Sequence, residues 1–294
     1  LIASSSNIAL FDFHSFQTII ESIPDTTRAI RLLDQLTVDQ FSEKFNRLRE
    51  LNIREGLNLF HNHKYHQAFD KFIEYIAPPF QIIQQFPSEL TSLEESPDTP
   101  LSEIPDAAVR SLTFFVTDQR RKLSKLLSSE THSLEYKDGL ISLNFFTEDK
   151  YSIEDILQIL DTTLFNIYIE TNPGLVGSLV RVDNHLDEGI VIQKLSDKGM
   201  NGELIDFYYK KGLHEKALSQ LEQDYQSNGD SYPLVKYIQQ LDNSHLDLIF
   251  KYSKEPILKD HENSARIFMD SVKSSKLNKF KVQAIVRDLP RAGL

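Results

Sequence analysis

From residue 153 onward, apolar residues recur every three or four positions in short stretches, and polar corners bearing Gly, Asn or Ser separate these stretches. The spacing predicts a run of amphipathic helices, most of them roughly 8 to 14 residues long. Helices of that length are marginal alone in water, so each must bury its apolar face against its neighbours. The predicted helices span residues 153–171, 175–182, 187–195, 201–211, 214–225, 232–241, 246–252, 263–272 and 279–289.

The helix over 153–171 has clear end signals. Ser152 and Asp155 have the spacing of a capping box, and Asn172-Pro173-Gly174 predicts the stop. The first half of the chain follows the same pattern, with a capping signal at residues 24–27 before a helix that contains residues 29–33. Further helices are predicted over residues 38–60, 65–76, 80–86 and 106–127.

Three stretches depart from this pattern. Residues 1–13 alternate loosely and predict one or two short strands, which we expect to be the edge of a preceding β domain in a longer protein. Residues 91–105 are rich in Ser, Pro and acidic residues, which predicts a mobile linker. Residues 128–150 carry Asp138-Gly139 between β-favouring residues, so they form either a short hairpin or a disordered insertion.

These predictions divide an all-α chain into four parts. Residues 1–13 are the β remnant, and 14–90 are a first segment of helical hairpins. Residues 91–150 are a helix flanked by mobile linkers, and 151–294 are a second helical segment.

Two helical hairpins can be superposed. Residues 60–72 align with 209–221, which places Phe60 on Tyr209 and Ala68 on Ala217. Each is a helix, a tight corner and a second helix whose small Ala allows close approach. Tetratricopeptide-like and clathrin-like α-solenoids are built from such units. Chance matching between amphipathic helices is the alternative.

Three segments resemble signatures of the vacuolar sorting protein thirty-nine (Vam six) family. They are DTTLFNIYIETNPGLV at 161–176, LIDFYYKKGLHEKAL at 204–218 and HLDLIFKYS at 245–253. The resemblance is specific over residues 153–269, weakens upstream and is absent from 91–150.

The resemblance implies a subunit of the HOPS complex, which tethers membranes at the vacuole or lysosome. In that family a β-propeller leads into a long helical solenoid, which ends in a zinc-binding module. Residues 1–13 would then be the last strands of the propeller. The corresponding subunits of the CORVET complex share parts of these motifs, and HOPS is favoured because residues 210–218 match so fully.

Composition excludes several functions. A net charge of -11 and a pI near 5.3 argue against nucleic acid as a partner and against direct binding to anionic lipid, so we expect membrane association to be indirect. The absence of Cys excludes disulfides, thiolate nucleophiles and cysteine-containing zinc sites.

The candidate metal and catalytic residues do not form a recognisable site. His61, His63 and His66 lie at a polar corner, which indicates solvated side chains rather than a metal site. There is no G-x-S-x-G motif, and adjacent carboxylates such as Asp187 and Glu188 do not face each other on a helix. We therefore expect no catalysis, no cofactor and no metal.

Most residues of the family pattern are expected to be architectural, with Gly212 forming a corner. These positions are Asp161, Thr162, Asn172, Leu175, Gly212, Leu213, His214, Ala217 and Leu218. Tyr208 and Tyr209 are candidate partner contacts, because tyrosine is enriched at interface hot spots, although at least one of them should be core. The basic run Arg120-Arg121-Lys122-Lys125 is predicted to be a solvated helix end, with lipid contact as the alternative.

The favoured function is a non-enzymatic scaffold in vesicle and late-endosome fusion with the vacuole. The resemblance implies other HOPS (class C) subunits as partners and, through the full-length protein, a vacuolar or lysosomal Rab GTPase. It also implies a cytoplasmic location, peripheral on the vacuole, lysosome or late endosome. The alternatives are the equivalent CORVET subunit, nucleotide exchange on a small GTPase, and a clathrin-type or tetratricopeptide-type adaptor of another complex.

Overall fold

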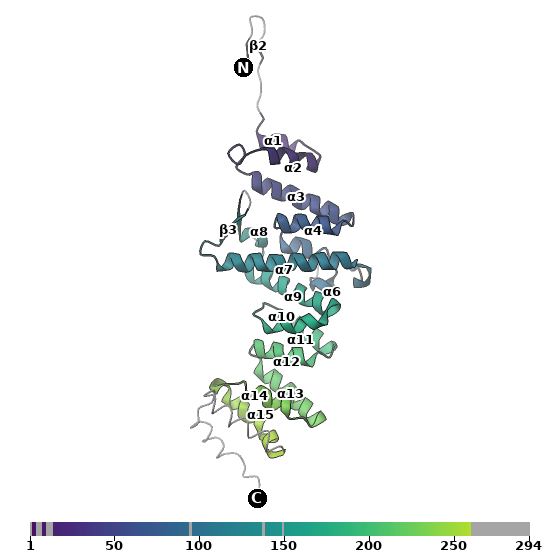
Figure 1. The fold of residues 1–294 in the computed structure, drawn as a ribbon, viewed down its shortest axis with the longest axis vertical. Helices are drawn as coiled ribbons and strands as arrows, with labels where there is room; N and C mark the ends of the chain where they lie inside the picture. Colours follow the sequence, from purple (N-terminus) through teal and green to yellow (C-terminus); the bar gives the residue numbers. More distant parts are fainter. Residues whose placement is uncertain are drawn as a thin grey trace. The chain divides into compact units, whose positions relative to one another are not determined.

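The protein is mostly helical in the residues that the computed structural model describes, namely 2–3, 8–9, 14–93, 96–136, 139–148 and 150–259 (Figure 1). This confirms the all-α class. Within those ranges, none of the helices combines the length and the apolar character needed to cross a membrane. The predicted helices over 263–272 and 279–289 lie outside the described residues.

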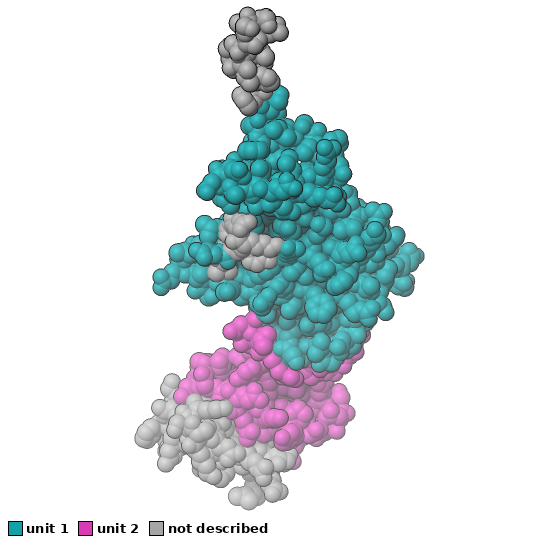
Figure 2. Space-filling view, turned by 45° about the horizontal axis from the view of Figure 1, so that its top comes forward, with its two compact units in different colours: residues 1–179, 184–193 teal, residues 180–183, 194–294 magenta. Residues whose placement is uncertain are grey.

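The chain forms two compact units, coloured separately in Figure 2. Unit 1 comprises residues 1–179 and 184–193, and unit 2 comprises residues 180–183 and 194–294. The helices of unit 1 are α1 (Phe16–Glu21), α2 (Thr26–Gln35), α3 (Lys44–His61), α4 (Tyr65–Glu74), α5 (Pro79–Ile83), α6 (Ser88–Thr91), the 3-10 turn η1 (Leu101–Glu103), α7 (Asp106–Ser128), α8 (Asn144–Thr147), α9 (Ile153–Thr171) and the 3-10 turn η2 (Pro173–Leu175).

Two further helices, α10 (Val176–Arg181) and α11 (Glu188–Asp197), each include a position at which the units divide. The elements of unit 2 are α12 (Asn201–Lys210), α13 (His214–Asn228), α14 (Tyr232–Ile238), the 3-10 turn η3 (Asn243–His245) and α15 (Leu246–Lys259).

In the described part of the chain, the short strands lie at two places. Near the N-terminus, β1 (Ile2–Ala3) pairs antiparallel with β2 (Ile8–Ala9). Between α7 and α8, β3 (Ser133–Tyr136) pairs with β4 (Gly139–Ser142), so this stretch forms the hairpin rather than the disordered insertion. Gly139 belongs to the strand, where it pairs with Tyr136.

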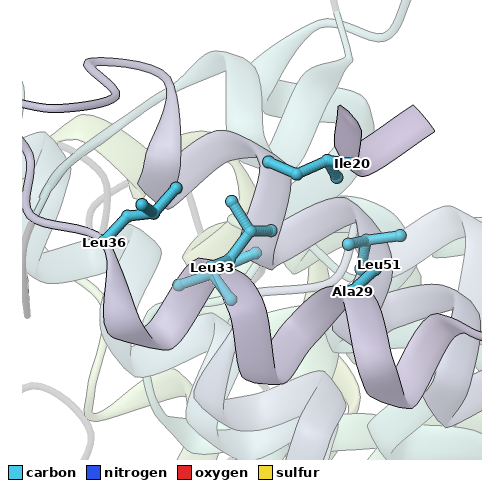
Figure 3. Close-up of a cluster of buried hydrophobic side chains, with 6 residues drawn as sticks. Ile20, Ala29, Leu33, Leu36 and Leu51 are labelled. Atoms are coloured by element: carbon cyan, nitrogen blue, oxygen red, sulfur yellow. The ribbon is translucent and has the colours of Figure 1, made fainter. Parts of the chain in front are cut away.

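The first helices of unit 1 share a small apolar core. Ile20 of α1 packs against Ala29 and Leu33 of α2, with Leu48 and Leu51 of α3 completing the cluster beside Leu36 (Figure 3). The side chain of Asp25 caps α2 by accepting the backbone N–H groups of Thr27 and Arg28, as the capping signal predicts.

Helix α3 begins at Lys44, later than the predicted start at residue 38. Residues 38–40 form a turn instead, in which the Gln40 side chain accepts the Thr37 backbone N–H at 2.9 Å. The Thr37 carbonyl accepts the N–H groups of Gln40 and Phe41, both at 3.1 Å, so this segment forms a single turn before α3. Apolar periodicity does not separate such a turn from the helix that follows it.

The α3–α4 hairpin is closely packed because small residues line its contact. Ala68 is fully buried, and a Cβ on Gly56 would lie 2.5 Å from the Phe72 ring and 3.3 Å from the Ala68 carbonyl oxygen. The close approach of the two helices therefore depends on Gly56 as well as on the Ala68 that the sequence predicts.

The two superposed hairpins end their first helices in the same way. In α12 the N–H of Leu213 donates to the Tyr208 carbonyl at 2.8 Å and that of Gly212 to the Tyr209 carbonyl at 3.1 Å. In α3 the N–H of Lys64 donates to the Leu59 carbonyl and that of His63 to the Phe60 carbonyl, both at 2.9 Å. His63 aligns with Gly212, and both have a positive φ, 59° and 71°. This shared Schellman geometry supports the alignment over a chance match.

Candidate functional site

Asp161 is a fully buried carboxylate in the middle of α9. One oxygen accepts the Arg120 Nε–H of α7, and the other accepts the backbone N–H of His185 at 2.7 Å. The His185 ring nitrogen Nδ1 lies 3.8 Å from the same oxygen. Asp161 thus fixes both α7 and the segment before α11 against α9, all within unit 1.

Thr162 extends this arrangement by one residue. Its hydroxyl accepts the backbone N–H of Asp187 at 3.1 Å. The Asp187 side chain then accepts the Ile190 N–H at 2.9 Å at the start of α11 and the Gln158 Nε2–H at 2.9 Å. Buried polar groups of α9 therefore hold the loop that enters α11.

Asn166, one turn further along α9, is also fully buried. Its amide donates to the Leu90 carbonyl at 3.1 Å and to the Ser92 hydroxyl at 2.8 Å. These bonds fix the end of α6, inside the stretch that composition predicts to be a linker.

The other family-pattern residues lie at helix ends or in packing contacts. Asn172 is the residue after α9, and Leu175, in η2, is half-exposed. Gly212 and Leu213 form the corner between α12 and α13, whereas Ala217 and Leu218 are fully buried.

A groove of about 360 Å³ lies in unit 2 between α12, α13 and α14. Its lining mixes apolar, aromatic and charged side chains: Asn201, Gly202, Ile205, Asp206, Tyr209, Leu221, Asp224, Pro233, Lys236, Tyr237 and Gln240. Tyr209 is 41% exposed, whereas Tyr208 is buried and packs into the core. Of the two tyrosines predicted as partner contacts, Tyr209 alone is at the surface.

An aromatic cluster stands behind Tyr209. Its ring lies edge-on to His214 (5.5 Å between centroids) and to Tyr237 (5.6 Å), and His214 Nδ1 is 2.9 Å from the Tyr237 hydroxyl. His245 packs on His214 at 4.5 Å, and its own Nδ1 is 3.1 Å from an Asp242 oxygen. The cluster holds the wall of the groove in place.

Burial determines the electrostatics of this cluster. It lowers the pKa of His214, His245 lowers it further, and Asp242 opposes both. It also raises the pKa of Tyr237, with a smaller contribution from Tyr209. Both side chains are therefore neutral near pH 7.

The basic run of α7 is not uniformly solvated. Arg120 pairs with Asp161, and Lys122 donates to the Ile73 carbonyl at 2.6 Å and pairs with Asp118. Arg121 and Lys125 are exposed. The solvated prediction is wrong for Arg120 and Lys122, because Asp161 and the Ile73 carbonyl lie far along the chain from them.

In the described ranges, no group of three or more His, Asp or Glu side chains is placed to hold a metal ion. His66, at the predicted solvated corner, has a side chain that is 90% exposed.

The partners of the family residues lie in other elements of the chain and are not indicated by the sequence. Arg120 lies 41 positions before Asp161, and His185 lies 24 positions after it. Tyr237 and His245 are likewise in other elements than His214. Helical periodicity relates neighbours along one helix, so it carries no signal for such pairs.

The segment that carries Asp161 and Gly212 is similar to a known protein family. The family model described as Vacuolar sorting protein 39 domain 1 matches residues 160–257. The chain is 29% identical to Vacuolar morphogenesis protein 6 of Schizosaccharomyces pombe, over 91% of the chain and 35% of that relative. It is 32% identical to Vacuolar morphogenesis protein 6 of Saccharomyces cerevisiae, over 69% and 23%.

Animal relatives are similar over the same extent. The human Vam6/Vps39-like protein is 27% identical over 92% of the chain and 33% of its own length. The chain thus spans between 23% and 35% of the length of these relatives. No solved structure matches it.

Proposed function

Because the chain belongs to the Vam6/Vps39 family, we propose that it is a non-catalytic scaffold segment of a HOPS-type membrane-tethering complex. Its relatives are named for vacuolar sorting and vacuolar morphogenesis. In this proposal the helical hairpins form a stretch of α-solenoid, preceded by a β-propeller to which residues 1–13 belong. The scaffold separates a Rab-binding end of the full-length protein from the end that joins the other subunits.

The proposal rests on what the family-pattern residues contact within this chain. Asp161 and Thr162 bond to groups of this same chain, and Gly212 forms a corner. Residues that serve catalysis face a substrate site, whereas these residues hold helices and loops to one another. Such a role fits a protein whose work is to present surfaces at fixed spacing.

The groove of unit 2 is the proposed contact for another tethering subunit. Tyr209 offers a half-exposed ring, and its packing against His214 and Tyr237 limits the rotamer entropy it loses on binding. Aromatic side chains held this way are typical interface hot spots. Membrane association is then indirect, and the protein acts on the cytoplasmic side of the vacuole, lysosome or late endosome.

The test is capture of purified HOPS and CORVET subunits, one at a time, on the immobilised chain. We expect one HOPS (class C) subunit to be retained, and Tyr209→Ala to weaken its binding about tenfold or more. Tyr232→Ala is the matched control, because Tyr232 is 61% exposed and lies outside the groove. Retention of a CORVET-specific subunit alone, or equal loss in both variants, would contradict the proposal.

A second arm tests catalysis directly. The chain is mixed with a vacuolar Rab GTPase that carries fluorescently labelled nucleotide, and nucleotide release is followed over time. We expect release at the intrinsic rate. Acceleration would replace the scaffold with nucleotide exchange, which needs no nucleophile and leaves no motif in the sequence.

A further inference from the structure

Helix α7, labelled in Figure 1, carries a row of exposed side chains along most of its length. The opposite face of the helix is buried in unit 1, with Leu112, Phe115, Val116 and Leu123 in the core. The exposed row follows the alternating four- and three-residue spacing of a coiled-coil seam: Arg110, Phe114, Thr117, Arg121, Ser124 and Ser128.

Phe114 is the prominent member of this row. It is 72% exposed, the largest value among the exposed large hydrophobic side chains of the described residues. A helix that packs one face in the core usually turns polar residues outward, so an aromatic ring in the middle of the solvent face calls for a partner.

Three cations, Arg110 and Arg121 of the row and the neighbouring Lys125, share this face with Phe114, although the chain has a net charge of -11. Arg110 lies one turn before Phe114, and Arg121 and Lys125 lie two and three turns after it. Arg110 and Lys125 have no ion pair or side-chain hydrogen bond with the part of the chain that the structure describes. Arg121 pairs with Asp118 at 2.6 Å and is 76% exposed, so this pair adds little stability.

We propose that this α7 row docks an acidic amphipathic helix of a partner protein, with one apolar side chain on Phe114 and carboxylates opposite the cations. The seam spacing fits a helix laid alongside α7, and the distance from Arg110 to Lys125 is about 22 Å, or four helical turns. The charge of the row complements an acidic helix. The surface lies in unit 1 and is separate from the Tyr209 groove.

The width of the row favours a helix over a lipid surface. The row is narrow, Asp106 is exposed at the start of α7, and Asp118 lies beside Arg121. A flat anionic membrane would meet these carboxylates together with the cations, whereas a single helix contacts the row alone. A hollow of about 460 Å³ lies beside Arg110 and Thr113, and Leu101, Ile104 and Val109 line it together with Asp106 and Glu170. The apolar part of this hollow offers room for an apolar side chain of the partner, whose carboxylates then lie opposite the cations further along α7.

The test uses the whole chain and a fluorescein-labelled three-heptad peptide with Leu on its contact seam and Glu at the flanking positions. Binding is measured by fluorescence anisotropy at two salt concentrations. We expect saturable binding that weakens about tenfold in high salt, because solvent-exposed charges are screened. Phe114→Ala should weaken binding about fivefold or more, and Arg110→Glu with Lys125→Glu about tenfold or more.

The matched control is Arg31→Glu with Lys64→Glu, which changes the net charge equally at exposed positions of unit 1 outside α7. It should alter the affinity less than about twofold. Circular dichroism melts establish that every variant is folded.

Three outcomes would overturn the proposal: equal loss in the control and the α7 variants, equal binding of a peptide with Lys in place of Glu, or no peptide binding at all. Vesicles containing phosphatidylserine form a further arm. The row would be assigned to lipid instead if three results came together. The protein would sediment with these vesicles, the variant Arg110→Glu with Lys125→Glu would not, and the peptide would not bind.

Discussion

A fully buried carboxylate such as that of Asp161 loses its hydration on folding, and Arg120 offsets that cost only while both partners are present. Asp161→Ala leaves the Arg120 guanidinium and the His185 N–H without this acceptor. We expect the free energy of unfolding to fall by about 3–5 kcal/mol, measured by urea denaturation.

The control is another Asp–Arg pair at the surface of unit 2. Arg181 and Asp206 are 2.7 Å apart, but both side chains are partly exposed. Asp206→Ala should cost only about 0.2–1 kcal/mol. Equal losses in the two variants would mean that Asp161 contributes as an ordinary surface ion pair.

His214 makes the stability of unit 2 depend on pH. Its pKa in the folded protein lies below the ordinary value of 6.5, so the unfolded chain binds the proton first as pH falls. The free energy of unfolding should therefore decrease from about pH 7.5 to about pH 5.5, and His214→Gln should flatten this decrease. Asp242 and Glu215 titrate below this window, because both have pKa values lowered from 3.8 and 4.5.

Thermal melts across this pH range provide the measurement. His66→Gln is the control, because the side chain of His66 is 90% exposed and it lies in unit 1. A slope that changes as much in the control as in His214→Gln would show that the cluster of His214, His245 and Tyr237 is not responsible.

At the scale of the residue, the sequence indicates which side chains are structurally important better than it indicates which side chains they contact. The family pattern singles out Asp161 and Thr162, and the corner at Gly212 follows from its type. The Arg120 partner, the burial of Tyr208 and the contact of His214 with His245 depend on which helices meet. Those contacts join positions tens of residues apart, and no local spacing encodes them.

At the scale of the element, the αL corner is the repeated device of the helical hairpins. Gly212 has a φ of 71°, and a Cβ there would meet nothing within 4 Å, so Gly212→Ala adds backbone strain without a clash. We expect it to lower the free energy of unfolding by about 1–2 kcal/mol. His63 occupies the equivalent corner with a φ of 59°, and His63→Gly should gain up to about 1 kcal/mol there.

Gly202→Ala is the control for these changes, since Gly202 lies in α12 with open space around it and without a positive φ. It should stabilise by about 0.4–1 kcal/mol. Denaturation curves of all three variants give the comparison, and a loss at Gly202 equal to that at Gly212 would contradict the strain argument.

Apolar periodicity predicts that a helix forms, whereas the residues at which it begins and ends depend on local hydrogen bonds. The capping box of Ser152 and Asp155 is present, with both of its hydrogen bonds. Helix α3 starts at Lys44 because residues 38–40 form a separate turn, in which the Gln40 side chain accepts the Thr37 N–H. Helix α15 continues through Pro256 to Lys259, beyond the predicted end at residue 252.

At the scale of the whole molecule, the matched family segment does not coincide with one compact unit. It begins at residue 160, inside α9, and ends at residue 257, inside α15. Residues of both units contribute to it. The boundaries of the family segment therefore differ from the boundaries of the compact units, and composition does not indicate where the chain divides.

The division itself has a consequence for any shortened form of the protein. The chain passes between the units three times, after Leu179, Asp183 and Gln193, so no single cleavage of the backbone separates them. A protease or a premature stop codon acting after Leu179 removes His185 and Asp187, whose N–H groups Asp161 and Thr162 accept. A product that ends after Gln193 keeps both donors. The fourteen residues 180–193 therefore decide whether a shortened protein still has the backbone N–H groups that Asp161 and Thr162 of α9 accept.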